Sequence, residues 1–147
     1  MGKSVKTVDT NRIPWEMIDV PELNARIPQK TCVVDEDTGM AVMKLCYKSG
    51  FTNVSHWHNC AHGMYVLDGI LVTDAGAFGP GSFIWFPEGT TMSHGAQADN
   101  DVTFLFITNK PFDIHYTHLE GGPRRSRSSR VLPRLCFYTY RGTGASM

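Results

Sequence analysis

Four histidines form the clearest chemical pattern in the chain: His56-x-His58-x3-His62, with His94 following 32 residues later. On an extended strand residues i and i+2 point to the same side, so His56 and His58 are expected to project together. A three-residue connection then lets His62 return from the start of the next element. Neutral imidazole is a common ligand of Zn²⁺, Fe²⁺, Ni²⁺ and Cu²⁺. The spacing therefore predicts a metal site; a solvated histidine-rich turn is the alternative.

The remaining histidines and the cysteines show no comparable pattern. His115 and His118 differ by three positions, which on a strand would place them on opposite faces, so they are interpreted as non-ligands. The four cysteines have no CxxC spacing and do not form a disulfide framework, which favours reduced, buried thiols. Together with an N-terminus that lacks an apolar signal-peptide core, this predicts a cytoplasmic protein.

The elements that would position the histidines are short strands separated by turn signals rich in Gly, Pro, Asn and Asp. We expect strands over 31–34, 40–47, 52–58, 62–67, 70–74, 82–86, 90–97, 102–108 and 112–118. Many short strands at such spacing predict an all-β sandwich or barrel, in which two facing sheets bury one side of each strand.

Composition changes at both ends of this region. Residues 1–29 carry prolines at 14, 21 and 28 and are expected to be an irregular segment, with room for one helical turn, that packs on the core or on a partner. Residues 30–120 form the predicted domain. Residues 121–147 begin with a basic, polar stretch that cannot bury a core, although 131–140 regains apolar residues and is a candidate edge strand.

The charges are divided unevenly along the chain. The 147 residues hold 14 Lys+Arg and 14 Asp+Glu, so the net charge is zero. Residues 1–120 contain all fourteen acidic residues and eight basic ones, a net −6, and 121–147 contribute six arginines. Overall neutrality argues against a dedicated nucleic-acid binder, and no apolar run is long enough to span a membrane.

Two segments resemble the motifs of the cupin superfamily. Gly50-x5-His56-x-His58-x3-His62-x6-Gly69 is similar to the first cupin motif, and Gly81-x5-Pro87-x-Gly89 to the start of the second. The resemblance implies a cupin jelly-roll β-sandwich or barrel with a metal inside, often as a homodimer. There are two departures from the motifs: His62 replaces the usual glutamate ligand, and His94 comes two residues later than the motif's last histidine.

An all-histidine site in a small cupin resembles the metal-dependent aromatic polyketide cyclases. This implies Zn²⁺ as a Lewis acid that polarises a ketone of a small aromatic or polyketide substrate for aldol condensation, with a nearby base such as Glu88 taking the α-proton. An Fe²⁺-dependent dioxygenase that cleaves a diketone or hydroxyacetophenone is the alternative. A non-enzymatic, small-molecule-binding cupin is the third hypothesis.

The predicted substrate pocket is apolar and aromatic. Met64, Val66 and Met92 share strand parity with His62 or His94. Phe104 and Phe106 share one face of the 102–108 strand, and Trp57 and Trp85 lie near the motifs in the sequence. Each of these residues is also a natural member of a sandwich core.

Overall fold

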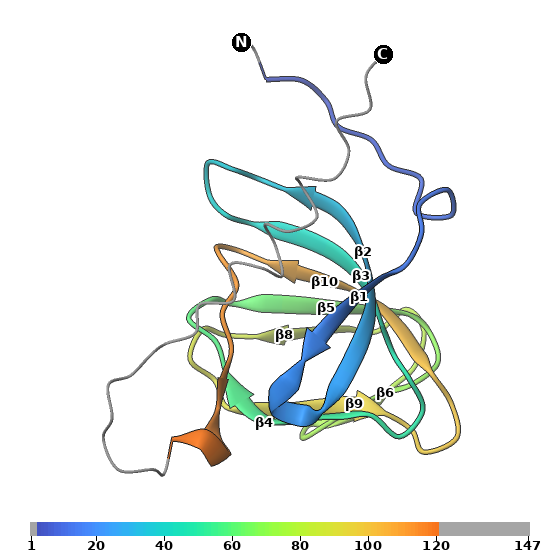
Figure 1. The fold of residues 1–147 in the computed structure, drawn as a ribbon, viewed down its shortest axis with the longest axis vertical. Helices are drawn as coiled ribbons and strands as arrows, with labels where there is room; N and C mark the ends of the chain where they lie inside the picture. The colour runs from blue at the N-terminus through green and yellow to red at the C-terminus, as the bar shows by residue number, and fades with distance from the viewer. Residues whose placement is uncertain (1–2, 121–147) are drawn as a thin grey trace.

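The computed structural model of the protein describes residues 3–120, which form two facing antiparallel sheets (Figure 1). The six-stranded sheet has the order β1 (Glu16–Val20), β2 (Ala25–Val34), β3 (Ala41–Tyr47), β10 (Val102–Thr108), β5 (His62–Asp68), β8 (Phe83–Phe86). The five-stranded sheet has the order β11 (His115–Tyr116), β4 (Thr52–Trp57), β9 (Met92–Ala96), β6 (Leu71–Thr73), β7 (Gly76–Phe78). Two 3₁₀ turns, η1 (Pro21–Leu23) and η2 (Thr117–Leu119), complete the regular structure, and the predicted all-β class is confirmed.

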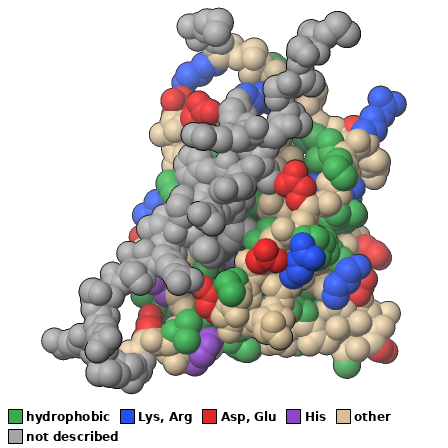
Figure 2. Space-filling model, viewed as in Figure 1, with side chains coloured by type: hydrophobic (Ala, Val, Ile, Leu, Met, Phe, Trp, Pro, Cys, Tyr) green, Lys and Arg blue, Asp and Glu red, His purple; other side chains and the backbone are tan. Residues whose placement is uncertain are grey.

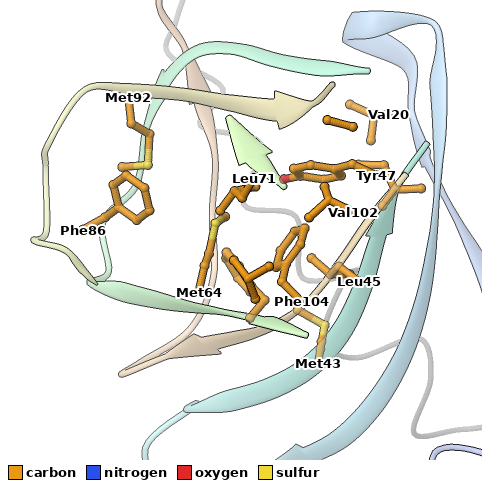
Figure 3. Close-up of a cluster of buried hydrophobic side chains, with 14 of the residues drawn as sticks. Val20, Met43, Leu45, Tyr47, Met64, Leu71, Phe86, Met92, Val102 and Phe104 are labelled. Carbon is orange, nitrogen blue, oxygen red and sulfur yellow. The ribbon is translucent and has the colours of Figure 1, made fainter. Parts of the chain in front are cut away.

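Strand alternation builds the core between the sheets. Along β10, Val102, Phe104, Phe106 and Thr108 are buried while the residues between them are only half-buried. Buried methionines and aromatic residues from the other strands fill the same layer, and in Figure 3 Phe86 and Met92 face each other. This layer, with its side chains interdigitated at high density, is the scaffold that holds the histidines.

The expectation of an irregular segment over residues 1–29 is wrong for residues 16–29. β1 pairs with the first part of β2, from Glu16 opposite Gln29 to Val20 opposite Ala25. Asn24, at φ 50°, adopts the left-handed conformation that reverses the chain. Pro28 precedes the pairing of β2 with β3, which begins at Gln29, so its missing N–H does not disturb that pairing.

Two smaller differences concern the ends of other segments. Residues 76–78, which lie outside the expected strands, form β7 against β6. The strand expected over 112–118 shortens to β11 followed by η2. The basic tail and the candidate edge strand at 131–140 lie outside the described residues.

Charged side chains are mixed on the surface. In the part of the described chain that Figure 2 displays, acidic and basic side chains are interspersed among apolar and uncharged ones. Residues 3–120 contain no helix with the length and apolar character needed to cross a membrane.

Candidate metal centre

The four histidines come from both sheets and meet between them. His56 lies on β4, His94 on β9 and His62 at the start of β5, while His58 directly follows β4. β4 and β9 belong to the five-stranded sheet and β5 to the six-stranded sheet. All four side chains are at most 2% exposed. The structure therefore brings together the four residues that the spacing singled out.

Their rings are gathered at similar distances. The centroids of His56 and His58, and of His58 and His62, are 4.8 Å apart, and those of His56 and His94 are 4.9 Å apart. His62 and His94 are more distant, at 6.2 Å. Imidazoles that share one ion through nitrogens at about 2.1 Å have centroids roughly 4.5–6.5 Å apart, depending on their angle at the metal. The observed spacing lies in that range.

Three of the rings are oriented by a bond at Nδ1. His56 Nδ1 donates to the carbonyl oxygen of Val54 at 2.6 Å, and His58 Nδ1 donates to that of Asp113. Because a carbonyl can only accept, both rings carry their proton on Nδ1 and keep a lone pair on Nε2. The Tyr47 hydroxyl lies 3.2 Å from His94 Nδ1. A bond at Nδ1 is the usual way in which a protein fixes the tautomer of a ligating histidine.

The opposite nitrogens are buried without partners. Among residues 3–120, Nε2 of all four histidines and Nδ1 of His62 are inaccessible and accept or donate no hydrogen bond. His62 lies instead between the rings of Phe86 and Phe106, each with its centroid 4.8 Å away. Buried nitrogens without partners are costly, so this cluster has the donor set that a metal ion would satisfy.

The environment keeps the four imidazoles neutral. Burial, followed by repulsion from neighbouring histidines, lowers the pKa of His58 to about 4 and that of His62 to about 2. Burial also lowers the pKa of His56 and, strongly, that of His94. Neutral imidazole is the form that binds a metal, so a proton does not occupy the lone pairs near neutral pH.

The arrangement of nitrogens is nevertheless incomplete. Within the described residues, no group of three or more His, Cys, Asp or Glu side chains stands in a geometry that could hold a metal ion as it is. Ring spacing and nitrogen placement thus disagree. The donor set still fits a metal ion, because the χ2 torsion of histidine has a broad, soft energy profile and small rotations of the rings cost little free energy.

The Pro87–Gly89 turn of the second motif is bonded to the backbone of His58. Gly89, at φ 77°, occupies the left-handed region that glycine enters without a steric cost, and its N–H donates to the carbonyl oxygen of His58 at 3.0 Å. This bond ties the Pro87–Gly89 turn to the end of β4. The motif's glycine therefore helps to place His58.

A small apolar cavity adjoins the cluster. It has a volume of about 50 Å³, and His58 and His94 contribute to its wall. Most of the wall comes from the N-terminal hairpin, β3 and the segment that follows β10: Ile18, Val20, Ile27, Met43, Leu45, Tyr47, Asn53, Phe106, Phe112, Ile114 and Tyr116. Of the seven predicted pocket residues, only Phe106 lines this cavity.

The other predicted pocket residues take different places. Met64, Val66, Met92 and Phe104 belong to the buried core. Trp85 is 53% exposed on the outer side of β8. Trp57 stacks on His115 with ring centroids 4.0 Å apart, and its Nε1 donates to Glu120 at 2.7 Å.

Glu88, the predicted base, is exposed and forms an ion pair with Lys110 at 2.8 Å. Another carboxylate was missed. Glu22, on η1, has a buried Oε2 without a hydrogen-bond partner in the described part of the chain. Burial and then the charge of Glu22 raise the pKa of Tyr116, a residue of the cavity wall. No sequence pattern marks Glu22, because it becomes relevant only when the N-terminal hairpin packs over the core.

Comparison with known proteins identifies similar folds. A family model described as the ChrR cupin-like domain matches residues 3–113. The polyketide cyclase RemF from Streptomyces resistomycificus has 18% identity and a TM-score of 0.64, with 78% of this chain and 86% of that chain covered. A putative acetylacetone dioxygenase from Methylibium petroleiphilum has 11% identity and a TM-score of 0.69, with 85% and 89% covered.

A third solved structure extends the range of functions found on this fold. The complex of Rhodobacter sphaeroides SigE with the anti-sigma ChrR matches with 16% identity and a TM-score of 0.56, covering 68% of this chain and 51% of that chain. No curated protein sequence matches the chain. At these identities the structural likenesses show the fold alone.

Proposed function

Because the chain belongs to the ChrR cupin-like family, we propose that it is a metal-dependent cupin enzyme that holds Zn²⁺ through its buried histidines. The observation that carries this proposal is the set of four neutral imidazoles whose Nε2 atoms are buried without partners in residues 3–120. His56, His58, His62 and His94 would be the ligands. Water, a substrate oxygen, or both would complete the coordination.

The reaction we propose is the cyclisation of an aromatic polyketide intermediate by aldol condensation. When bound, zinc supplies a Lewis acid that polarises a ketone and favours its enolate. An all-imidazole donor set adds no negative charge, so it leaves the ion more electrophilic than a set that includes a carboxylate. The likeness to the fold of a polyketide cyclase is consistent with this chemistry.

The chain's own residues would shape the reaction around this site. The apolar wall, including Ile18, Phe106 and Phe112, excludes water and limits how a substrate can fold. Glu88 was the expected proton acceptor, but its ion pair with Lys110 at the surface offers no support for that role. We assign the role to Glu22, whose Oε2 is buried without a partner in residues 3–120 and whose charge acts on Tyr116 of the cavity wall.

Cleavage of a small diketone by an Fe²⁺-dependent dioxygenase is the second candidate. The size of the cavity favours it: about 50 Å³ is well below the roughly 150 Å³ of a cavity that admits benzene, so a large polyketide needs more rearrangement than a short diketone. The fold is also similar to that of a putative acetylacetone dioxygenase.

Metal content separates the two candidates. Protein purified without added metal would be analysed for its elements, then assayed for oxygen uptake on a β-diketone and for ring closure of a linear diketone. About one zinc per chain with oxygen-independent ring closure supports the cyclase. Iron with oxygen consumption supports the dioxygenase, and metal without either turnover supports a small-molecule-binding cupin.

A pair of variants tests the site itself. His58→Ala removes a buried member of the cluster, whereas His118→Ala removes an exposed histidine on η2. The first variant should lose the metal and the second should keep it. Full metal content in His58→Ala would show that the ligand assignment is wrong.

A further inference from the structure

A second polar cluster, centred on Asp113, adjoins the histidine cluster at His58 and Asn59. Its carboxylate is 10% exposed and accepts three hydrogen bonds. Oδ1 accepts from the backbone N–H of Asn59 at 2.7 Å, and Oδ2 accepts from Asn59 Nδ2 at 2.5 Å and from His115 Nε2 at 2.9 Å. Buried carboxylates are retained where such bonds satisfy them, so this cluster is an organised element of the site's surroundings.

The cluster acts on the connection that carries two of the proposed ligands. Asn59 is the residue directly after His58 and begins the turn that leads to His62. Asn109 holds the other end of the same turn: its Oδ1 accepts from Ala61 N–H at 3.0 Å, and its N–H donates to the Ala61 carbonyl at 3.2 Å. Residues 109–115 therefore form hydrogen bonds to both ends of the 59–61 turn.

The backbone of Asp113 reaches the cluster directly. Its carbonyl oxygen accepts the Nδ1 proton of His58, which leaves a lone pair on the Nε2 of a ring whose centroid lies 4.8 Å from those of His56 and His62. The side chain and the carbonyl of one residue therefore act together. The carboxylate sets the position of the turn, and the carbonyl sets the tautomer and rotation of the ring.

We propose that Asp113 is the positioning residue of the metal site: its carboxylate holds the Asn59–Ala61 turn so that His58 and His62 present their nitrogens to a shared ion. This inference rests on the proposed function, because it presupposes that the histidines bind a metal. Residues behind the ligands commonly change metal affinity by about 10- to 100-fold when they are removed.

A second aspartate provides a matched control for a purely structural role. Asp101 also accepts a backbone N–H in a tight turn, from Ser49 at 2.8 Å, and it bonds Lys48 at 3.3 Å. It bonds the turn between β3 and β4, which carries none of the four histidines. If Asp113 only stabilised the fold, Asp113→Asn and Asp101→Asn would have similar effects.

The test uses Co²⁺, whose visible spectrum reports on ligands and geometry, as a probe in the full chain. Asp113→Asn should weaken Co²⁺ and Zn²⁺ binding by about 10- to 100-fold and shift the cobalt spectrum, while Asp101→Asn should leave both unchanged. Asn59→Ala loses the side-chain bond to Asp113 but keeps the bond from the backbone N–H of residue 59 to Asp113 Oδ1. Its metal affinity and cobalt spectrum should therefore change in the same direction by a smaller amount. This milder variant carries the test if Asp113→Asn fails to fold.

A second measurement is independent of metal binding. Long-range ¹H–¹⁵N spectra of the metal-free protein should show His58 as the Nδ1–H tautomer. Asp113→Asn keeps the backbone carbonyl that accepts this proton, so it should keep the tautomer, and its weaker metal binding then reports on the position of the turn. Unchanged affinity and an unchanged cobalt spectrum in a folded Asp113→Asn variant would overturn the positioning role alone. Failure of the wild-type protein to bind Co²⁺ or Zn²⁺ would instead overturn the proposed function, and this inference with it.

Discussion

Tyr47 and His94 contact each other inside the protein: the Tyr47 hydroxyl lies 3.2 Å from His94 Nδ1, and the two rings are nearly parallel, at 9°, with their centroids 5.7 Å apart. Tyr47 is on β3 of the six-stranded sheet and His94 on β9 of the five-stranded sheet. The bond therefore spans the interior and orients the proposed ligand that follows the second motif.

Removing this hydroxyl should weaken metal binding. In Tyr47→Phe, Nδ1 of His94 loses its partner while the packing of the ring is kept, so metal affinity should fall by about tenfold and stability by about 1 kcal/mol. Zinc titration and urea unfolding would measure these effects. Tyr65→Phe, at an exposed tyrosine on β5, is the control and should change neither quantity.

Acid should destabilise the metal-free protein. Burial first, and neighbouring histidines second, lower the pKa of His58 from 6.5 to about 4 in the folded chain. Below pH 6.5 the unfolded chain therefore binds more protons than the folded chain, and stability is lost as the pH falls from about 6.5 towards about 4. Urea unfolding at a series of pH values would measure the slope.

The same pH series has a built-in comparison. His58→Gln should show a shallower loss of stability below pH 6.5, because one depressed imidazole is gone. His118→Gln, at an exposed position, should keep the wild-type slope. Equal stability of the metal-free wild type at about pH 7 and about pH 5 would contradict the assignment of a neutral buried cluster.

The two candidate bases should behave differently. Glu22→Gln keeps the shape of the side chain but removes the proton acceptor, so turnover should fall by about 10² to 10⁴ with unchanged metal content. Glu88→Gln breaks an exposed ion pair with Lys110 and should leave turnover nearly unchanged. The opposite result would return the role of base to Glu88.

Close backbone packing beside His94 predicts a sensitive glycine. A Cβ on Gly95 would clash with the Phe51 carbonyl and lie 2.9 Å from the Thr52 Cα, on the strand that pairs with β9. Gly95→Ala should destabilise the fold by about 1–3 kcal/mol and displace His94. Gly79→Ala, with no atom within 4 Å of its Cβ, should be close to neutral. Equal urea midpoints for the two variants would contradict this packing.

Local periodicity was sufficient to identify the histidine cluster. The period of two along a strand places His56 and His58 on the same side, and it likewise separates the buried Met64 from the exposed Tyr65 on β5. These relations depend only on neighbouring residues, so they can be read from the chain and they specify the all-β class. The same period separated His115 from the proposed ligands: its ring stacks on Trp57 and not on the four histidines.

The wall of the cavity could not be read in this way, because distant parts of the chain build it. Ile18 and Val20 precede the first motif, whereas Phe112 and Ile114 follow β10. Their meeting depends on the order of strands in the two sheets, about which local alternation is silent. Trp85 points outward because its neighbour Phe86 pairs with His62 and turns inward, a consequence of pairing with β5.

Glu22 and Asp113 show the same division. No local pattern distinguishes either residue in the sequence. Their proposed roles depend on residues far along the chain: the charge of Glu22 acts on Tyr116, and Asp113 accepts a hydrogen bond from Asn59. The residue types and short spacings were enough to identify the proposed ligands. Which residues orient them, close the cavity and supply a buried carboxylate depended on long-range packing, because those contacts form only when the two sheets come together.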